Sequence, residues 1–425
     1  CRYIFHEGVA GTGILNFNGG TLKPIRSQTD DWDCFMGGGR YSWDSQPERP
    51  LTAAYVHAGG AIFDTAGFNI LVNQTLLTGT NITDGGLTKN GNGILTLTGT
   101  NTFTGPVVVN GGTLYANVGN RANNANFSFV SGITVNSGGT LRSGGNCLFG
   151  WDGSQARPIT VNAGGTATVD ENNDVNVGVV TLNGGTLAGS TNNTGWGSWS
   201  FGRAAVNSLT ATENSTVTAR NVSMFNGASI DVSAGKTLTI SGTVDDSNNG
   251  ASAIIKSGGS GTLVLSGANT YTGNTTINAG TLELAQSAAT LAAASTVTIA
   301  SGAQLKLAVA TVTNQVAGLV TNGVAAAPGL YSSANSAGFI SGPGYLQVGT
   351  VGPSGPAPLT ASYSGGMLNL TWPAGVNWRL ECQTNSLSTG LSATGWSTVT
   401  GVSDGSAVIP VDPSAPSVFY RLVYP

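Results

Sequence analysis

A repeated stretch of sequence constrains the fold of this chain more than any other feature. Residues 93–114 read GILTLTGTNTFTGPVVVNGGTL, and residues 261–282 read GTLVLSGANTYTGNTTINAGTL. A lysine and a glycine-rich turn precede each copy, at Lys89 and Lys256. A shorter element recurs more often: an apolar residue, Asn, one or two glycines, and then Thr, usually followed by Leu. Copies start at Phe17, Val109, Val135, Val161, Leu182 and Ile277. Self-similarity of this kind is the signature of a repeat architecture.

Each short copy predicts a strand, a tight corner and the start of a second strand. Alternating apolar residues form the strand, Asn-Gly permits positive φ at the corner, and Thr-Leu opens the next strand. Adjacent copies lie roughly 20 to 27 residues apart, which suits one three-stranded coil of a β-solenoid. Such a coil buries its apolar face only by stacking on its neighbours, with Asn, Thr and Val or Leu aligned in ladders. We therefore predict an all-β chain with a parallel β-solenoid over residues 1–349.

Composition agrees with this prediction and excludes several functions. Charged residues make up 8% of the chain, whereas about a quarter is usual in soluble proteins. Disorder is excluded, since 40% of the residues are hydrophobic. The net charge of -4 and the lack of a basic run predict no nucleic-acid partner. The apolar runs are too short for a transmembrane helix. Because the sequence starts at Cys1 and not at Met, we expect that a leader was removed or lies outside it.

A different pattern begins after residue 349. Residues 350–358 form a Gly/Pro-rich linker, and residues 359–425 give short alternating runs separated by turn residues. These runs predict a small β-sandwich of the fibronectin-like or immunoglobulin-like type. Its core would contain the aromatic residues Trp372, Trp378, Trp396, Phe419 and Tyr420.

The longer repeat, GxLxLxGxNTYTGxTTxNxGTL, resembles the β-strand repeat associated with the autotransporter passenger domains of bacteria. The resemblance covers the two clear copies and, more loosely, residues 8–348; Ser341–Gly349 is similar to the coil that often closes such arrays. It implies a secreted, right-handed parallel β-solenoid and says little about activity. In that family a membrane domain of long alternating strands follows the passenger. We expect a different export route, because this sequence has no such segment.

The segment 23–50 interrupts the repeat and holds nine of the 36 charged residues. Segments that extend from a solenoid are common places for function. Its carboxylates could bind calcium as a cluster of oxygen ligands, and these are Asp30, Asp31, Asp33 and Asp44. Its aromatic rings could stack on the sugars of surface glycans, and these are Trp32, Tyr41 and Trp43. Alternatively, the segment folds against the solenoid and pairs its acids with Arg26, Arg40 and Arg49. We expect no other cofactor and no other metal.

Other candidates for chemistry lie in Asn- and Ser-rich corners. Some β-helices degrade polysaccharides with paired carboxylates, and the candidates here are Asp170, Glu171, Asp174, Asp245 and Asp246. Asp is common in turns, so we interpret both groups as turn residues. Trp196 and Trp199 could face a glycan or cover the side of the solenoid. The two histidines, His6 and His57, do not accompany a nucleophile motif. We predict that the chain is not an enzyme.

The four cysteines and the open ends of the array bear on assembly. A solenoid exposes strand edges at its first and last coils. We therefore predict a head-to-tail homopolymer in which the N-terminal segment of one subunit meets the C-terminal module of the next. Cys1 and Cys382 could form an intersubunit disulfide outside the cytoplasm. Cys34 and Cys147 could form an intrachain disulfide, or both could remain thiols. The cysteine spacing does not suit zinc.

Together these features predict a secreted or cell-surface structural protein, either a filament subunit or a stalk-like adhesin. The alternative is a carbohydrate-binding or carbohydrate-degrading β-helix that uses the segment 23–50. A third interpretation is a passenger fragment whose missing parts carry the activity.

Overall fold

In the computed structural model, the chain divides into two units. The residues that the structure describes are 4–5, 11–30, 33–37, 50–79, 83–117, 126–144, 148–149, 156–170, 173–189, 197–202, 208–225, 227–246, 252–349, 358–373, 378–386, 388–403, 405–414 and 416–423. One unit comprises Cys1–Ala327 and Tyr331–Leu346, and the other comprises Pro328–Leu330 and Gln347–Pro425. All secondary structure in the described residues is β. None of these residues belongs to a helix with the length and apolarity that a membrane span requires.

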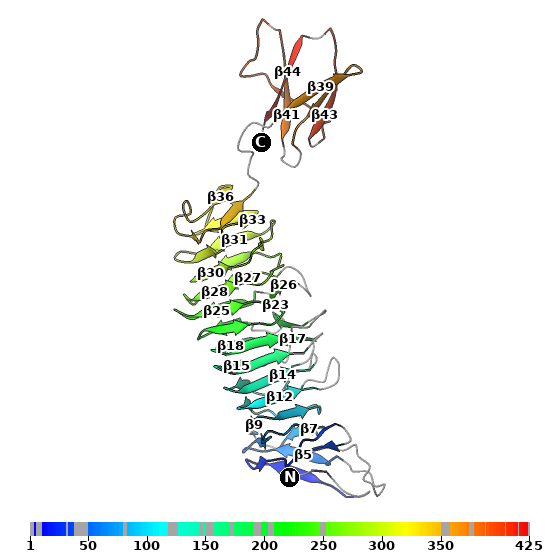
Figure 1. Ribbon diagram of the computed structural model, residues 1–425, viewed down its shortest axis with the longest axis vertical. Helices are drawn as coiled ribbons and strands as arrows, with labels where there is room; N and C mark the ends of the chain where they lie inside the picture. Colours follow the sequence, from blue (N-terminus) through cyan, green and yellow to red (C-terminus); the bar gives the residue numbers. More distant parts are fainter. Residues whose placement is uncertain are drawn as a thin grey trace. The chain divides into compact units, whose positions relative to one another are not determined.

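Two long sheets of stacked parallel strands make up most of the first unit (Figure 1). The 12-stranded sheet contains, along the stack, β7 (Ile70–Val72), β10 (Ile94–Leu97), β12 (Gly112–Ala116), β14 (Gly139–Ser143), β16 (Thr166–Val169), β19 (Thr186–Gly189), β22 (Ser215–Val217), β25 (Thr237–Ile240), β28 (Thr262–Leu265), β30 (Thr281–Leu284), β32 (Gln304–Leu307) and β37 (Ile340–Ser341).

The 14-stranded sheet contains β2 (Thr21–Leu22), β6 (Ala61–Asp64), β9 (Leu87–Asn90), β11 (Val107–Val109), β13 (Ile133–Val135), β15 (Ile159–Asn162), β18 (Val179–Asn183), β21 (Ser208–Ala211), β24 (Ser229–Val232), β27 (Ile254–Lys256), β29 (Thr275–Ile277), β31 (Thr296–Ile299), β34 (Gly318–Thr321) and β35 (Val324–Ala325). Its last strand, β35, is antiparallel to β34.

Shorter sheets supply further strands to the coils. One parallel sheet contains β1 (Ile14–Phe17), β5 (Ala53–Val56) and β8 (Leu76–Thr78), and another contains β17 (Asn173–Val177), β20 (Gly197–Phe201), β23 (Asn221–Met224) and β26 (Thr243–Asp245). A last sheet has the order β33 (Thr313–Val316), β38 (Tyr345–Val348) and β36 (Gly329–Tyr331). The chain thus visits the 14-stranded sheet, the 12-stranded sheet and, in some coils, a third strand before it returns. The predicted parallel β-solenoid is confirmed.

The strands stack in register because equivalent residues of successive coils lie directly over one another. Leu114 pairs with Leu141, and Leu263 pairs with Leu282, which in turn pairs with Leu305. These leucines point into the core and are at most 1% exposed. Their neighbours along each strand point outward and remain partly exposed, as alternation in a strand requires. Each coil therefore buries its apolar residues against the coils before and after it.

The predicted asparagine ladder is also present. Asn110 donates to the side-chain oxygen of Asn90 at 2.9 Å, and Asn136 donates to that of Asn110 at 2.7 Å. Asn162 continues the ladder at 2.7 Å and Asn183 at 3.2 Å. Successive members are 20, 26, 26 and 21 residues apart in the sequence. The Asn of the short repeat thus bonds like to like along the corner of the solenoid, which fixes the stacking register.

Part of the segment 23–50 lies in the stack. β3 (Thr29–Asp30) and β4 (Asp33–Cys34) form a short antiparallel hairpin. On either side of it, Gln28 and Met36 bridge to residues Ile70 and Val72 of β7. Phe35 and Met36 are fully buried. These residues of the segment therefore contribute to the core of the first unit.

The second unit contains two small antiparallel sheets, as predicted for the C-terminal module. One has the order β39 (Thr360–Ser364), β40 (Met367–Thr371) and β43 (Ser406–Pro410); the other has the order β42 (Ser397–Thr398), β41 (Arg379–Asn385) and β44 (Ser417–Val423). Leu370, Trp372, Leu380 and Ala407 form the buried core, and Trp378 and Tyr420 pack against it. The prediction was wrong for Phe419, which alternates away from the core, and for Trp396, whose ring lies against Arg421 at 4.2 Å.

Candidate functional site

The structure describes only a small part of the candidate ligand site in the segment 23–50. Asp30 is exposed on β3 and pairs across the hairpin with Asp33 of β4. Asp31, Trp32, Tyr41, Trp43 and Asp44 lie outside the described residues. Among the described residues, no group of three His, Cys, Asp or Glu side chains is placed to hold a metal ion. Calcium and glycan binding by this segment therefore stay predictions.

The predicted disulfide pairs are likewise only half described. Cys34 is half-buried on β4, and Cys382 is half-buried on β41 opposite Tyr420. Cys1 and Cys147 lie outside the described residues. Both pairings stay predictions.

The carboxylates considered for hydrolysis bind donors from neighbouring coils. Asp170 accepts from Arg142 at 2.6 and 3.0 Å, and Tyr115 donates to it at 2.8 Å. This bond raises the pKa of Arg142. Asp174 accepts from Ser200 at 2.8 Å, Asp245 from Ser223 at 2.7 Å, and Asp246 from the backbone N–H of Ser252 and Thr272 at 2.6 and 2.7 Å. Glu171 lies outside the described residues. These four acids join coils together, which is a more specific role than that of solvated turn residues.

The tryptophan considered for glycan contact is part of the core where the structure describes it. Trp199 of β20 is fully buried, and its indole N–H donates to the carbonyl of Ala188 at 2.7 Å. Trp196 lies outside the described residues. Contact between a glycan and Trp199 is therefore excluded by burial.

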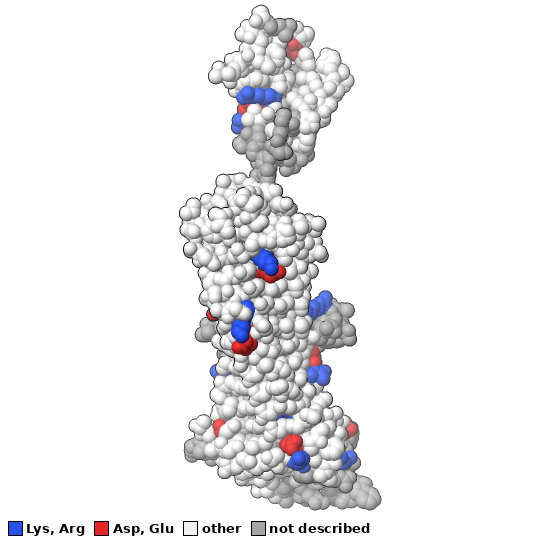
Figure 2. All heavy atoms as spheres, turned by 60° about the vertical axis from the view of Figure 1, so that its left-hand side comes forward, with Lys and Arg blue, Asp and Glu red and all other residues white. Residues whose placement is uncertain are grey.

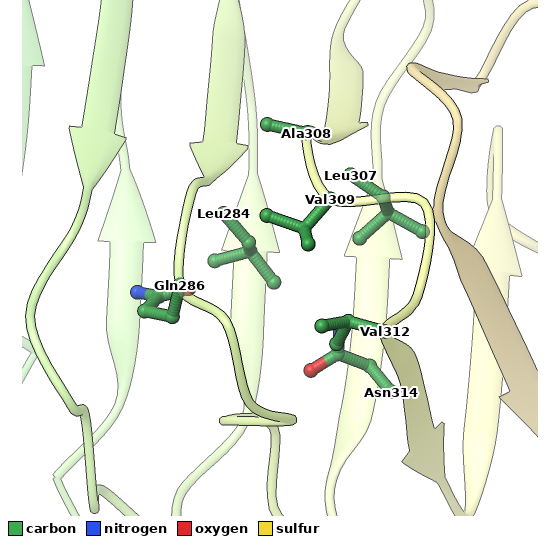
Figure 3. Close-up of a pocket in the computed structure, with 7 residues that line it drawn as sticks. All are labelled: Leu284, Gln286, Leu307, Ala308, Val309, Val312 and Asn314. Atoms are coloured by element: carbon green, nitrogen blue, oxygen red, sulfur yellow. The ribbon is translucent and has the colours of Figure 1, made fainter.

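A shallow hollow lies between the late coils (Figure 3). Leu284 of β30, Leu307 of β32 and Val309 form its apolar lining, and Asn314 of β33 and Gln286 supply amides. The amide of Asn314 already accepts the N–H groups of Thr290 and Leu291. The hollow leaves no enclosed room between these side chains, whereas ligand pockets measure roughly 300 Å³ or more. We therefore assign it no ligand.

The most unusual polar group of the solenoid is the lysine that precedes the first long repeat. Lys89 lies on β9 and is fully buried, in register with the core residues Phe63 and Val109. Its ammonium donates to the hydroxyl of Thr65 at 3.0 Å and to the carbonyls of Asn90, Gly91 and Gly111 at 2.9, 2.7 and 2.9 Å. These four oxygens come from three successive coils. Burial lowers the pKa of Lys89 from 10.5 to about 8, and the charge of Asp64 opposes this change.

The lysine before the second long repeat has the same placement. Lys256 lies on β27 and is fully buried, in register with Ile230 and Ile277. Its ammonium donates to the carbonyls of Ser257 and Gly259 in the following turn. Burial also lowers the pKa of Lys256, again opposed by a carboxylate, that of Asp231. Both lysines therefore satisfy corner carbonyls inside the solenoid.

A second set of hydrogen bonds, between an Asp and a Thr, joins each long repeat to the coil before it. Asp84 is 3% exposed, and Thr104 donates to it through both its backbone N–H and its hydroxyl, at 2.6 and 2.9 Å. Thr78 and the backbone N–H groups of Gly86 and Gly105 complete the set. Burial raises the pKa of Asp84, but these hydrogen bonds outweigh it, and the pKa lies below 3.8. In the second copy, Thr272 binds Asp246 in the same way.

The remaining residues of the long repeat also act between coils. Asn101 accepts the N–H of Leu76, and Asn269 accepts that of Val244, both at 2.9 Å. The aromatic rings that follow, Phe103 and Tyr271, are each 1% exposed. Gly105 stands so close to the previous coil that a Cβ there would lie 2.3 Å from the backbone nitrogen of Gly86. The signature Asn-Thr-aromatic-Thr-Gly is thus a set of contacts to the preceding coil.

A family model described as the passenger-associated transport repeat matches residues 87–116 and 256–284. The chain carries two passenger-associated transport repeats. One match contains Lys89 and Thr104, and the other contains Lys256 and Thr272. The two matches therefore coincide with the two places where the solenoid has a buried lysine and an Asp–Thr contact between coils. No significantly similar protein was found among curated proteins or among solved structures.

Sequence reasoning located the transport repeats but missed two of their contacts. It identified Lys89 and Lys256 only as residues before a turn, because a lysine is seldom buried without a carboxylate partner. It did not identify Asp84, which lies outside the stretch that repeats. An acid precedes each repeat, but Asp84 lies nine positions before residue 93 and Asp246 lies 15 positions before residue 261, so the spacing gave no signal.

Proposed function

We propose that this chain is an extracellular structural protein of the passenger type, which serves as a surface filament subunit or a stalk-like adhesin and carries no catalytic site. The observation that supports the proposal best is the use of its polar residues. The buried lysines of both transport repeats donate to corner carbonyls, and the acids considered as candidates for catalysis accept from groups of adjacent coils. Such residues stabilise a stack and leave little for chemistry.

The charges on the surface of the first unit favour the same role. Lys306 pairs with Glu283 at 3.1 Å and Arg142 with Asp170 at 2.6 Å, and Lys236 pairs with Glu213. Figure 2 shows such neighbouring opposite charges on a surface that carries few other charges. Paired charges of this kind produce little long-range field, so they do not steer a charged substrate or nucleic acid. A surface with these properties suits a spacer that projects a binding end away from a cell.

Electron microscopy of the native protein in negative stain tests the assembly part of the proposal. Filaments that repeat at a regular interval support a filament subunit, and their loss in reductant supports the intersubunit pair Cys1 and Cys382. Isolated short particles in both samples contradict head-to-tail assembly and leave the stalk-like adhesin. Gels with and without reductant check the disulfide separately, since a monomer band in both excludes it.

A glycan array and a reducing-sugar release assay test the structural role. We expect no sugar release from polysaccharides of any class. Release would contradict the proposal, and Asp170→Asn, Asp174→Asn and Asp245→Asn would then show whether one of the acids between coils is responsible. Glycan binding without sugar release would support the adhesin. The double substitution Asp30→Asn and Trp43→Ala would then test whether the segment 23–50 binds the glycan. Digestion of intact cells with a protease that cannot enter them tests the surface location, and assay of the culture medium tests secretion.

A further inference from the structure

The last strand of the second unit has an edge that no other described strand covers. β44 is seven residues long and pairs only with β41. The register with β41 runs without a break from Val423 opposite Arg379 to Ser417 opposite Asn385, so no bulge turns the edge away. The strand contains neither Lys nor Pro, and most of its residues are large and apolar. Natural proteins usually protect an edge strand with charges, prolines or bulges, and of these β44 has a single charge, Arg421, which is held in an ion pair with Glu381.

The core of the sandwich is also incomplete along β44. Leu380, on the central strand β41, is fully buried, whereas every residue of β44 is at least partly exposed. Tyr420 and Leu422 face the core but are only half-buried. Val418 lies on the same side by alternation and is 38% exposed. A further strand along this edge would cover these three side chains.

We propose that β44 of a second copy of this chain covers the edge, in an antiparallel pair about a twofold axis at Tyr420. This register is the one in which all seven residues of each strand find a partner. Val418 then lies opposite Leu422 of the second copy, so the two cores join across the interface. The two three-stranded sheets become one continuous sheet. A twofold pair of this kind is self-complementary, since each contact occurs twice.

The outward side of the strand agrees with the same register. Arg421 would lie opposite Phe419 of the second copy, where a guanidinium can rest against the face of an aromatic ring. In its own chain Arg421 binds Glu381 at 2.8 and 3.0 Å and stacks on Trp396, which fixes its position. A register centred on Arg421 would instead place two arginines face to face, and like charges directly opposite destabilise a pair of strands.

The pairing does not rest on the end-to-end assembly proposed above. A twofold contact closes after two copies, whereas a head-to-tail contact remains open to further subunits. The two proposals therefore predict different products: a dimer joined at the C-terminal modules, and a chain of subunits.

Sedimentation of the full chain over a range of concentrations tests the pairing through the sign of a charge at position 419. Phe419→Lys would face Arg421 of the second copy twice, and we expect it to weaken the dimer about tenfold. Phe419→Glu would face the same arginine with the opposite charge, and we expect a dimer as tight as the wild type or tighter. Val408→Lys is the matched control, because Val408 is 61% exposed on β43 of the other sheet; we expect no change.

Several results would overturn the pairing. One is a wild-type chain that stays monomeric at every concentration. Another is an equal loss of dimer with Lys and with Glu, which would show that position 419 matters only for folding. Polymers whose length is the same in both variants would also overturn it, while leaving end-to-end assembly standing. Far-UV circular dichroism of each variant checks that its sheets are intact.

Discussion

The buried ammonium of Lys89 should make the stability of the solenoid depend on pH in the alkaline range. The pKa is 10.5 for a free lysine and about 8 for Lys89 in the fold. Between these two values the unfolded chain binds more protons than the folded one, so the free energy of unfolding rises with pH. A difference of about 2.5 pKa units corresponds to at most about 3.4 kcal/mol. The gain is complete above 10.5 and absent below about 8.

Lys89→Met removes the titrating group and isolates this effect. The variant should lose stability at every pH, because the corner carbonyls of Asn90, Gly91 and Gly111 lose their donor inside the core. The loss relative to the wild type should grow from pH 7.5 to pH 10, by at most about 3 kcal/mol. Lys256 titrates in the same direction in both proteins, so it cancels from the difference.

Urea unfolding followed by far-UV circular dichroism at pH 7.5, 8.5, 9.5 and 10 measures the difference. The series stops at 10 because burial raises the pKa of Tyr271 to about 12, so this residue opposes the trend above that point. Lys306→Met is the control, since Lys306 pairs with Glu283 at the surface and is 43% exposed; we expect a loss below about 1 kcal/mol. A difference between the wild type and Lys89→Met that stays constant from pH 7.5 to 10 would refute the reasoning.

Three further substitutions test the contacts between coils. Asp84→Asn should cost about 3 kcal/mol at pH 7, because an amide cannot accept from all the donors around this site. The pKa of Asp84 in the fold is lowered from 3.8, so the cost should shrink as the pH falls through this lowered pKa in acid unfolding experiments. Asn136→Ala removes two bonds of the asparagine ladder and should lower the urea midpoint by the equivalent of about 1 kcal/mol. Asp170→Asn weakens a half-exposed ion pair with Arg142, so thermal unfolding should show less than about 1 kcal/mol at low salt and almost nothing in 1 M salt.

The sequence was sufficient to predict the solenoid because stacking repeats the same contact. A residue such as Leu114 lies over its own equivalent, Leu141, so the period of the sequence is the period of the structure. The asparagine ladder follows from the same rule. The hydrogen bonds between Asp84 and Thr104 do not follow from this rule, because they join two different residue types across 20 positions. Such a contact becomes visible only when the length of the intervening coil is known.

The sandwich illustrates a second limit of sequence reasoning. Hydrophobicity alone assigned Phe419 to the core together with its neighbour Tyr420, yet adjacent residues of a strand point to opposite faces. Arg421 determines which face each residue takes, because its bond to Glu381 places the odd-numbered residues of β44 on the outer face. In the segment 23–50, the sequence identified charge and aromatic content but gave no sign that Phe35 and Met36 enter the core. Without a repeat to count against, short segments leave their register undetermined.

The few charges of this chain are explained by where a stack of parallel strands needs donors. A strand pairs its backbone groups with the coils above and below, but a corner turn leaves carbonyls that point inward without a strand partner. A lysine suits such a place, because one ammonium offers three N–H donors within a small volume. In the first transport repeat, Lys89 reaches the corners of its own coil and of the next one, Gly91 and Gly111. Its charge is costly to bury, which limits the device to a few coils. The residues that make the repeat recognisable are therefore those that hold one coil on another, and this is why the repeat is informative about architecture and nearly silent about activity.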